Sequence, residues 1–176
     1  MKVYGIALLF FALLFISCRK EIKYENIGLK NGLYTDLSNG KILDGKYKSL
    51  TQPENAMQKE NVIEREFSDG IPTGEWTETY GGDLYFNGEY LIEEDLKSDI
   101  QKTTKCKRVD LDFWKELDYP YLTIGLIQPE VTDTLTLQKV IELSKSQLLN
   151  KYNFRSVRID SIGQTRNNYI YSSDLK

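Results

Sequence analysis

The residues that could carry chemistry in this chain are carboxylates, lysines, tyrosines and serines, because the sequence contains no histidine and only two cysteines. Without histidine, Ser/His and Cys/His nucleophile arrangements and histidine metal sites are excluded. Asp110 and Asp112 are separated by one residue, and Glu93, Glu94 and Asp95 are consecutive. Neither group has the glycine and spaced oxygen donors of a dedicated calcium loop. We therefore expect these acids to be solvated surface groups, and we expect no catalytic, cofactor or metal site.

Cys106 is the cysteine that lies far from the N-terminus, and it is flanked by Lys105 and Lys107. Neighbouring cations can lower the pKa of a thiol and make it reactive, whereas a cysteine in a strand is usually a small buried hydrophobe. We favour the buried interpretation over the reactive one.

Charge and composition narrow the classes of partner and activity. The chain has 176 residues and carries 23 Lys and Arg against 26 Asp and Glu, a net charge of −3. This balance does not favour nucleic acid as a partner.

An enzyme that uses only carboxylates, Tyr, Lys or Ser is a lesser alternative, which a pair of facing carboxylates with raised pKa values in a pocket would favour.

The N-terminus has the pattern of a secretory signal with a distinctive end. A basic residue is followed by an apolar run over residues 3–16, which is short for spanning a bilayer. The run ends in Phe15-Ile16-Ser17-Cys18, which resembles a bacterial lipobox, where a small residue precedes a cysteine that is lipidated and becomes the first residue of the mature protein. The resemblance implies a signal peptide over residues 1–17, lipidation of Cys18 and a cell-envelope location, with the outer membrane favoured. We expect residues 18–27 to form a tether.

Two copies of one pattern occupy residues 28–92. Each copy has a glycine, an aromatic residue, Thr and an acidic residue, followed by a second glycine and then Gly-x-Tyr. The copies align as Gly32-Leu33-Tyr34-Thr35-Asp36 with Gly74-Glu75-Trp76-Thr77-Glu78, and as Gly45-Lys46-Tyr47 with Gly88-Glu89-Tyr90. Each copy predicts a β-hairpin that turns at Asn39-Gly40 or Gly81-Gly82, because these dipeptides supply the positive φ values of tight turns. Residues 28–92 are therefore predicted to form an antiparallel hairpin ribbon, or meander.

The pattern resembles the MORN-repeat-variant family, whose copies run roughly Gly-x-Trp-x-x-Tyr-x-x-x-Gly-x-x-x-x-x-Gly-x-Tyr. The second copy matches through Gly74, Trp76, Tyr80, Gly82, Gly88 and Tyr90. Such proteins are common as bacterial envelope lipoproteins and are often labelled antitoxin-like. We expect the aromatic residues of the copies mainly to pack the hairpins against each other. The same residues are the candidate partner-binding residues: Tyr34, Tyr47, Trp76, Tyr80 and Tyr90.

We recognise no family pattern in residues 93–176, and these residues are predicted to form a small α+β domain. Their pattern predicts the order β-β-α-β-β, a sheet with one helix packed on it. The strands before and after the helix could pair in parallel, through a right-handed crossover, or lie antiparallel. The predicted elements are strands over Thr103–Phe113 and Tyr121–Ile127, a helix over Thr136–Lys151 that begins at a Thr134 or Thr136 cap, and strands over Phe154–Ile162 and Tyr169–Tyr171.

The whole chain is thus predicted to be α+β and mostly β. We expect a lipid-anchored envelope lipoprotein that acts as a non-enzymatic protein-binding module, with a narrower version in which it is an immunity protein against an incoming toxin. Its contacts would be the membrane, through the N-terminal lipid, and a protein partner. A structural or assembly role in the outer membrane is the alternative.

Overall fold

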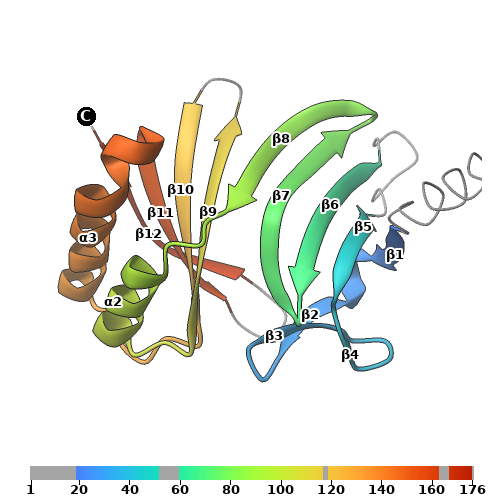
Figure 1. The fold of residues 1–176 in the computed structure, drawn as a ribbon, viewed down its shortest axis with the longest axis horizontal. Coiled ribbons are helices and arrows are strands. Elements are labelled where there is room, and N and C mark those ends of the chain that lie inside the picture. Colours follow the sequence, from blue (N-terminus) through green and yellow to red (C-terminus); the bar gives the residue numbers. More distant parts are fainter. Residues whose placement is uncertain (1–18, 52–59, 117–118, 163–166, 176) are drawn as a thin grey trace, which may run out of the picture.

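The computed structural model describes residues 19–51, 60–116, 119–162 and 167–175, and its fold is α+β and mostly β, as predicted. Nine strands form one mixed sheet in the order β1-β5-β6-β7-β8-β9-β10-β11-β12, and three strands form a small sheet in the order β2-β3-β4. Helices α2 and α3 cover one face of the C-terminal half of the large sheet (Figure 1). The predicted signal peptide 1–17 and the predicted lipidation site Cys18 lie outside the described residues.

The elements of the first half are β1 (Lys20–Lys23), a 3-10 helix η1 (Tyr24–Asn26), β2 (Ile27–Lys30), β3 (Leu33–Asp36), β4 (Lys41–Ile42), β5 (Gly45–Thr51), β6 (Asn61–Ser68), β7 (Ile71–Tyr80) and β8 (Asp83–Tyr90). The elements of the second half are α2 (Glu94–Thr104), β9 (Arg108–Glu116), β10 (Tyr119–Ile127), α3 (Thr134–Tyr152), β11 (Ser156–Ile162) and β12 (Asn167–Asp174).

The second copy of the repeat is a continuous hairpin, as predicted. Strands β7 and β8 pair antiparallel and turn at Gly81-Gly82, whose φ values are 61° and 93°. The first copy also turns at Gly40, with a φ of 73°, but its strands belong to two sheets. β3 and β4 lie in the small sheet, and β5 enters the large one after Leu43, which is buried against Ile22 and Phe67. The prediction of one ribbon built from two equivalent hairpins is therefore wrong.

The segment expected to be a tether, residues 18–27, contains regular structure. Residues 20–23 form β1, which pairs in parallel with β5. Ile22 is buried in this strand while the residues on either side of it are exposed, so one apolar side chain fixes the strand to the body of the protein. The sheet therefore begins two residues after Cys18.

The two halves of the chain share the large sheet, whereas the sequence predicts a separate sheet for each. Strand β8 pairs antiparallel with β9, with Gly88 opposite Trp114 and Tyr90 opposite Asp112. Gly88 also lies opposite Trp76 of β7. A glycine at this point leaves room for the tryptophans of the two neighbouring strands, and the sheet continues without interruption from β1 to β12 (Figure 1).

The helix predicted over Thr136–Lys151 is present as α3, and its apolar stripe is buried. Leu137, Val140, Ile141 and Leu148 are among the residues that pack into the core. The capping residue is Asp133 rather than a threonine. Its side chain accepts a hydrogen bond from the Thr136 backbone N–H at 3.0 Å, which satisfies a donor of the first helical turn.

The structure has a second helix in this half, α2, where the sequence predicts only one. Its buried residues Leu96, Ile100 and Thr104 are spaced by four, but two aliphatic side chains in a short acidic segment give a weak pattern. The strand predicted from Thr103 consequently begins later, at Arg108. Strands β10 and β11, on either side of α3, pair in parallel, which resolves the alternatives that the sequence leaves open.

Gly88→Ala is expected to destabilise the protein at the junction of the two halves. An added Cβ would lie 2.6 Å from Trp76 Nε1 and 2.8 Å from Trp114 Cβ, and overpacking of this kind costs about 1–3 kcal/mol. Denaturant unfolding should show a loss of this size. Asn87→Ala, at an exposed neighbouring position, is the control, and equal unfolding midpoints for the two variants would contradict the role given to Gly88.

Candidate functional site

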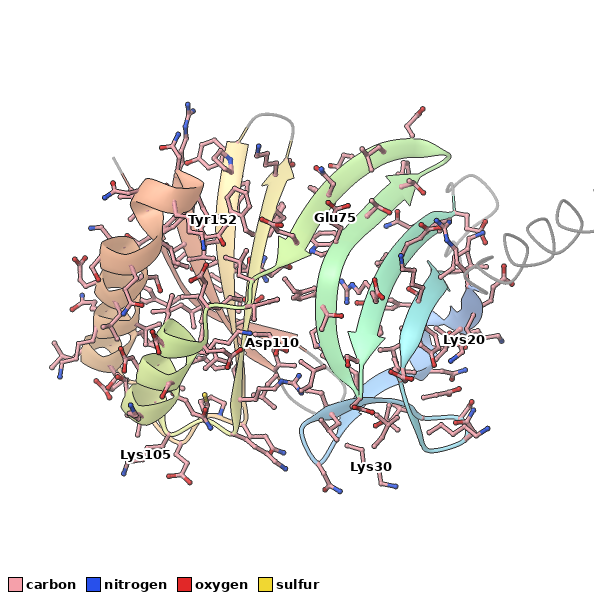
Figure 2. The ribbon with its side chains drawn as sticks, viewed as in Figure 1. Lys20, Lys30, Glu75, Lys105, Asp110 and Tyr152 are labelled. Carbon is pink, nitrogen blue, oxygen red and sulfur yellow. The ribbon has the colours of Figure 1, made fainter. Side chains whose placement is uncertain are left out.

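The face of the large sheet opposite α2 and α3, here called the open face, carries a cavity of about 220 Å³. Side chains from β6 to β11 line this space, together with Tyr34 of β3 in the small sheet. Alternation along β9 separates the two faces, since Val109 and Leu111 belong to the core under the helices while Asp110 and Asp112 line the cavity. Asp110, on β9, lies near the centre of the molecule, where the helix-covered strands meet the strongly curved strands (Figure 2).

Aromatic side chains form much of the wall of this cavity. They come from β3, β7, β8 and β9, and they are Tyr34, Trp76, Phe86, Tyr90 and Trp114. The rings of Phe86 and Trp114 meet edge to face, with their centroids 5.3 Å apart. The chain contains two tryptophans, and both are in this wall. A wall of this kind suits contact with an apolar or planar group.

Three of the predicted partner-binding residues, Tyr34, Trp76 and Tyr90, line the cavity. Tyr47 borders a neighbouring depression of about 440 Å³, which also reaches Trp76. Tyr80, at the end of β7, is 44% exposed and borders neither space. The structure therefore brings four of the five predicted residues to adjoining surfaces and leaves Tyr80 apart.

Two arginine–aspartate pairs neutralise much of the charge around the cavity. Arg108 donates from Nε and Nη2 to the two carboxylate oxygens of Asp110 at 2.8 and 2.9 Å, and Arg158 Nε donates to Asp160 Oδ1 at 2.7 Å. Burial raises the pKa of Asp110, and the ion pair with Arg108 opposes that rise. Asp110 is only 7% exposed and Asp112 is half-buried. The prediction that these two acids are solvated surface groups is therefore wrong.

Arg65, which the sequence does not single out, is a cation of the cavity wall that belongs to no close ion pair among the described residues, although the carboxyl group of Asp112 is near enough to interact with its charge. Within the described parts of the chain, its guanidinium makes no hydrogen bond or ion pair, and its Nε is enclosed. Its Cζ lies 5.7 Å from the centre of the Trp76 ring. The pairing of β6 with β7 shifts register at this residue, between Glu64 and Glu66, and such bulges commonly redirect a side chain. Because a guanidinium stays charged, this arrangement leaves a partly buried positive charge that can accept an anion.

Asp112 is a carboxyl group of the cavity outside the two ion pairs. Trp76 Nε1 donates to its Oδ1 at 2.7 Å, a bond that joins β7 to β9. Burial raises the pKa of Asp112 to about 7, while the Trp76 hydrogen bond and the charge of Arg65 oppose the rise. Asp112 therefore changes charge near neutral pH, in a chain without the histidine that normally does so.

The hydroxyl and carboxyl groups of the cavity differ in how far their neighbours engage them. Burial raises the pKa of Tyr34 to about 12 and also raises the pKa of Tyr90, so both hydroxyls remain neutral donors beside Arg65. Acid–base hydrolysis by paired carboxyl groups needs two that can reach the substrate. Asp110 has both oxygens engaged by Arg108, which leaves Asp112 as the more available carboxyl of the two.

Cys106 is 4% exposed, and burial raises the pKa of its thiol. The buried interpretation is therefore confirmed, and the raised pKa disfavours a reactive thiolate.

In the described residues, no group of three or more Cys, Asp or Glu side chains is placed to hold a metal ion. None of the described helices is long and apolar enough to cross a membrane.

Comparison with known proteins does not assign the chain to a family. No family model matches it, and no curated protein is significantly similar in sequence. Among solved structures it is similar to the C-terminal domain of the sex pheromone staph-cAM373 precursor from Staphylococcus aureus, with 12% sequence identity and a TM-score of 0.23. The match covers 74% of this chain and 46% of that chain, and at this TM-score it does not establish a common fold. The MORN-repeat-variant resemblance stays a prediction.

Asp112→Asn is expected to flatten the pH dependence of stability near neutral pH. Because the pKa of Asp112 is raised from 3.8 to about 7 in the folded protein, its contribution to stability is complete below about pH 4 and is lost as the pH rises to about 7. The slope between these limits is at most about 1.4 kcal/mol per pH unit. The variant should therefore gain stability over the wild type as the pH rises through this window, measured by denaturant unfolding at pH 5 and pH 8.

Asp36→Asn is the matched control for this experiment. Hydrogen bonds from Ser38 lower the pKa of Asp36, so this group titrates below the window and its replacement should leave the slope unchanged. A slope in Asp112→Asn as steep as that of the wild type would assign the pH dependence to another group.

Proposed function

We propose that this protein is a lipid-anchored lipoprotein of the bacterial cell envelope that binds a protein partner on its open face and catalyses no reaction. The apolar N-terminal run and the lipobox-like Phe15-Ile16-Ser17-Cys18 support the anchor. Strand β1 begins at Lys20, so a lipidated Cys18 would hold the sheet close to the membrane surface. The outer membrane is the favoured location.

The observation that carries the binding role is the cavity around Arg65. Its wall combines five aromatic side chains with an arginine whose guanidinium makes no hydrogen bond or close ion pair in the described residues. Tyr, Trp and Arg are the residue types that most often dominate the energy of protein–protein contacts. A partly buried charge outside an ion pair lowers stability, and a bound anionic group would compensate for this cost.

The narrower form of the proposal is an immunity protein that neutralises an incoming toxin at the envelope. The antitoxin-like label of proteins with the MORN-repeat-variant pattern supports it, and so does the small acidic chain with a net charge of −3. This form predicts tight binding to one secreted protein, encoded next to this one in the genome.

Two other roles make different predictions. A structural or assembly role in the outer membrane predicts weak contacts with abundant envelope proteins. A histidine-free enzyme is the second candidate, and the raised pKa of Asp112 favours it. If the protein is an enzyme, the wild type turns over a substrate and Asp112→Asn abolishes that turnover. If it is a binding protein, the wild type itself shows no turnover.

Capture of the partner tests the binding role. The full-length protein with a C-terminal affinity tag is cross-linked in its native envelope, purified and analysed by mass spectrometry. We expect one stoichiometric partner, lost in Phe86→Lys, which places a charge in the cavity wall, and retained in Leu135→Lys, which alters an α3 side chain that is 72% exposed. Equal capture by both variants would contradict binding on the open face, and recovery of abundant envelope proteins alone would favour the structural role.

Cys18→Ala is expected to release the protein from the membrane fraction, because the thiol that would carry the lipid is absent. Several acyl chains are needed for firm anchoring, at about 0.8 kcal/mol per buried methylene. Cell fractionation and immunoblotting measure the change. Cys106→Ala serves as the matched control and should stay in the membrane fraction, and a Cys18→Ala variant that also stays there would disprove the lipobox assignment.

A further inference from the structure

We infer that the Arg65 cavity binds a single carboxylate group, which the partner protein presents as an acidic side chain or as its C-terminus. The inference rests on the proposed binding function and specifies the chemistry that the open face recognises. It follows from the charge, size and lining of the cavity.

The positive charge of Arg65 is the feature that calls for an anion. The guanidinium has no hydrogen bond or ion pair in the described parts of the chain, although it lies in a largely enclosed position beside the Trp76 ring. Arginine presents a planar set of donors that matches a carboxylate with two parallel hydrogen bonds. Burial keeps Tyr34 and Tyr90 protonated, so their hydroxyls are available as further donors on the same wall.

The charges around Arg65 favour a monoanion over a phosphate. Arg108 and Arg158 are already paired with Asp110 and Asp160, which leaves Arg65 as the unpaired cation among the described residues of the wall. The acids Glu78 and Asp112 line the same cavity, and they would repel a dianion more strongly than a monoanion. A phosphate dianion would need more positive charge than this wall supplies.

The size of the cavity favours one small group. Its volume of about 220 Å³ lies below the roughly 300–1,000 Å³ of pockets that hold drug-sized ligands. A single acidic side chain or a small aromatic acid fits this scale. The aromatic wall formed by Phe86, Tyr90 and Trp114 would contact the carbon atoms next to the carboxylate.

Tryptophan fluorescence gives a direct readout, because the two tryptophans of the chain both line the cavity. The purified protein is titrated with benzoate, with its neutral analogue benzamide, and with phenyl phosphate at equal ionic strength. We expect saturable quenching by benzoate and at least a tenfold weaker response to the other two compounds. A response to benzamide equal to that of benzoate would overturn the role of charge, and a stronger response to phenyl phosphate would overturn the choice of a carboxylate.

Arg65→Gln tests whether this residue supplies the charge. We expect the apparent Kd for benzoate to rise at least tenfold, with a smaller rise in Arg65→Lys, which keeps the charge but loses the planar donor pair. Arg19→Gln is the matched control, since Arg19 is exposed, is paired with Glu64 and does not line this cavity. Unchanged benzoate affinity in Arg65→Gln would refute the inference, and circular dichroism confirms that each variant is folded.

The two proposals fail in different ways. If the Arg65→Gln variant captures a protein partner as well as the wild type does, the binding function stands and the carboxylate inference falls. If benzoate binds through Arg65 but no protein partner is captured, the site exists and the proposed partner is wrong. Absence of benzoate quenching in the wild type also rejects the inference.

Discussion

A glycine placed between two tryptophans is the constraint on which the rest of the structure depends. Gly88 of β8 lies opposite Trp76 on one side and Trp114 on the other, so the sheet of the first half can pair directly with the sheet of the second. The hydrogen bond from Trp76 Nε1 to Asp112 crosses the same junction. This contact makes one sheet from two parts of the chain, and it brings Arg65 from β6 into the same cavity as carboxyl groups from β9 and β11.

The two faces of the sheet have different roles because they have different chemistry. Under α2 and α3 the residues are almost all aliphatic and buried, which provides the apolar burial that stabilises a domain. The open face instead combines aromatic rings with ion pairs and with one arginine that makes no hydrogen bond or close ion pair in the described residues. The apolar burial under the helices can therefore offset the loss of folding free energy caused by a partly buried charge on the open face. A bound anion would reduce that loss.

Much of the fold could be predicted from sequence, because turn glycines and apolar periodicity are local signals. The hairpin turn at Gly81-Gly82 and the stripe of α3 follow directly from them. The joining of the halves could not be predicted, since nothing in the local pattern distinguishes an edge strand from one that pairs with the next domain. The first repeat copy is split for a related reason: the burial of Leu43 is a tertiary effect that overrides the repeat.

Only some residues of the site could be identified from the sequence, because the site is assembled by pairing between strands that are distant in the chain. The aromatic repeat residues Tyr34, Trp76 and Tyr90 identified one part of the wall. Arg65 lies in an otherwise ordinary alternating strand, and a bulge that only the structure reveals marks its position. The spacing of Asp110 and Asp112 was noticeable, but their burial depends on Arg108 and on the strands that surround them.

The central claim is that a partner contacts the open face, and photo-cross-linking in the native envelope tests it most directly. A photoreactive phenylalanine analogue at Phe86 should yield a specific adduct, while the same group at Leu135 on α3 should yield none. An adduct from α3 alone would contradict the account.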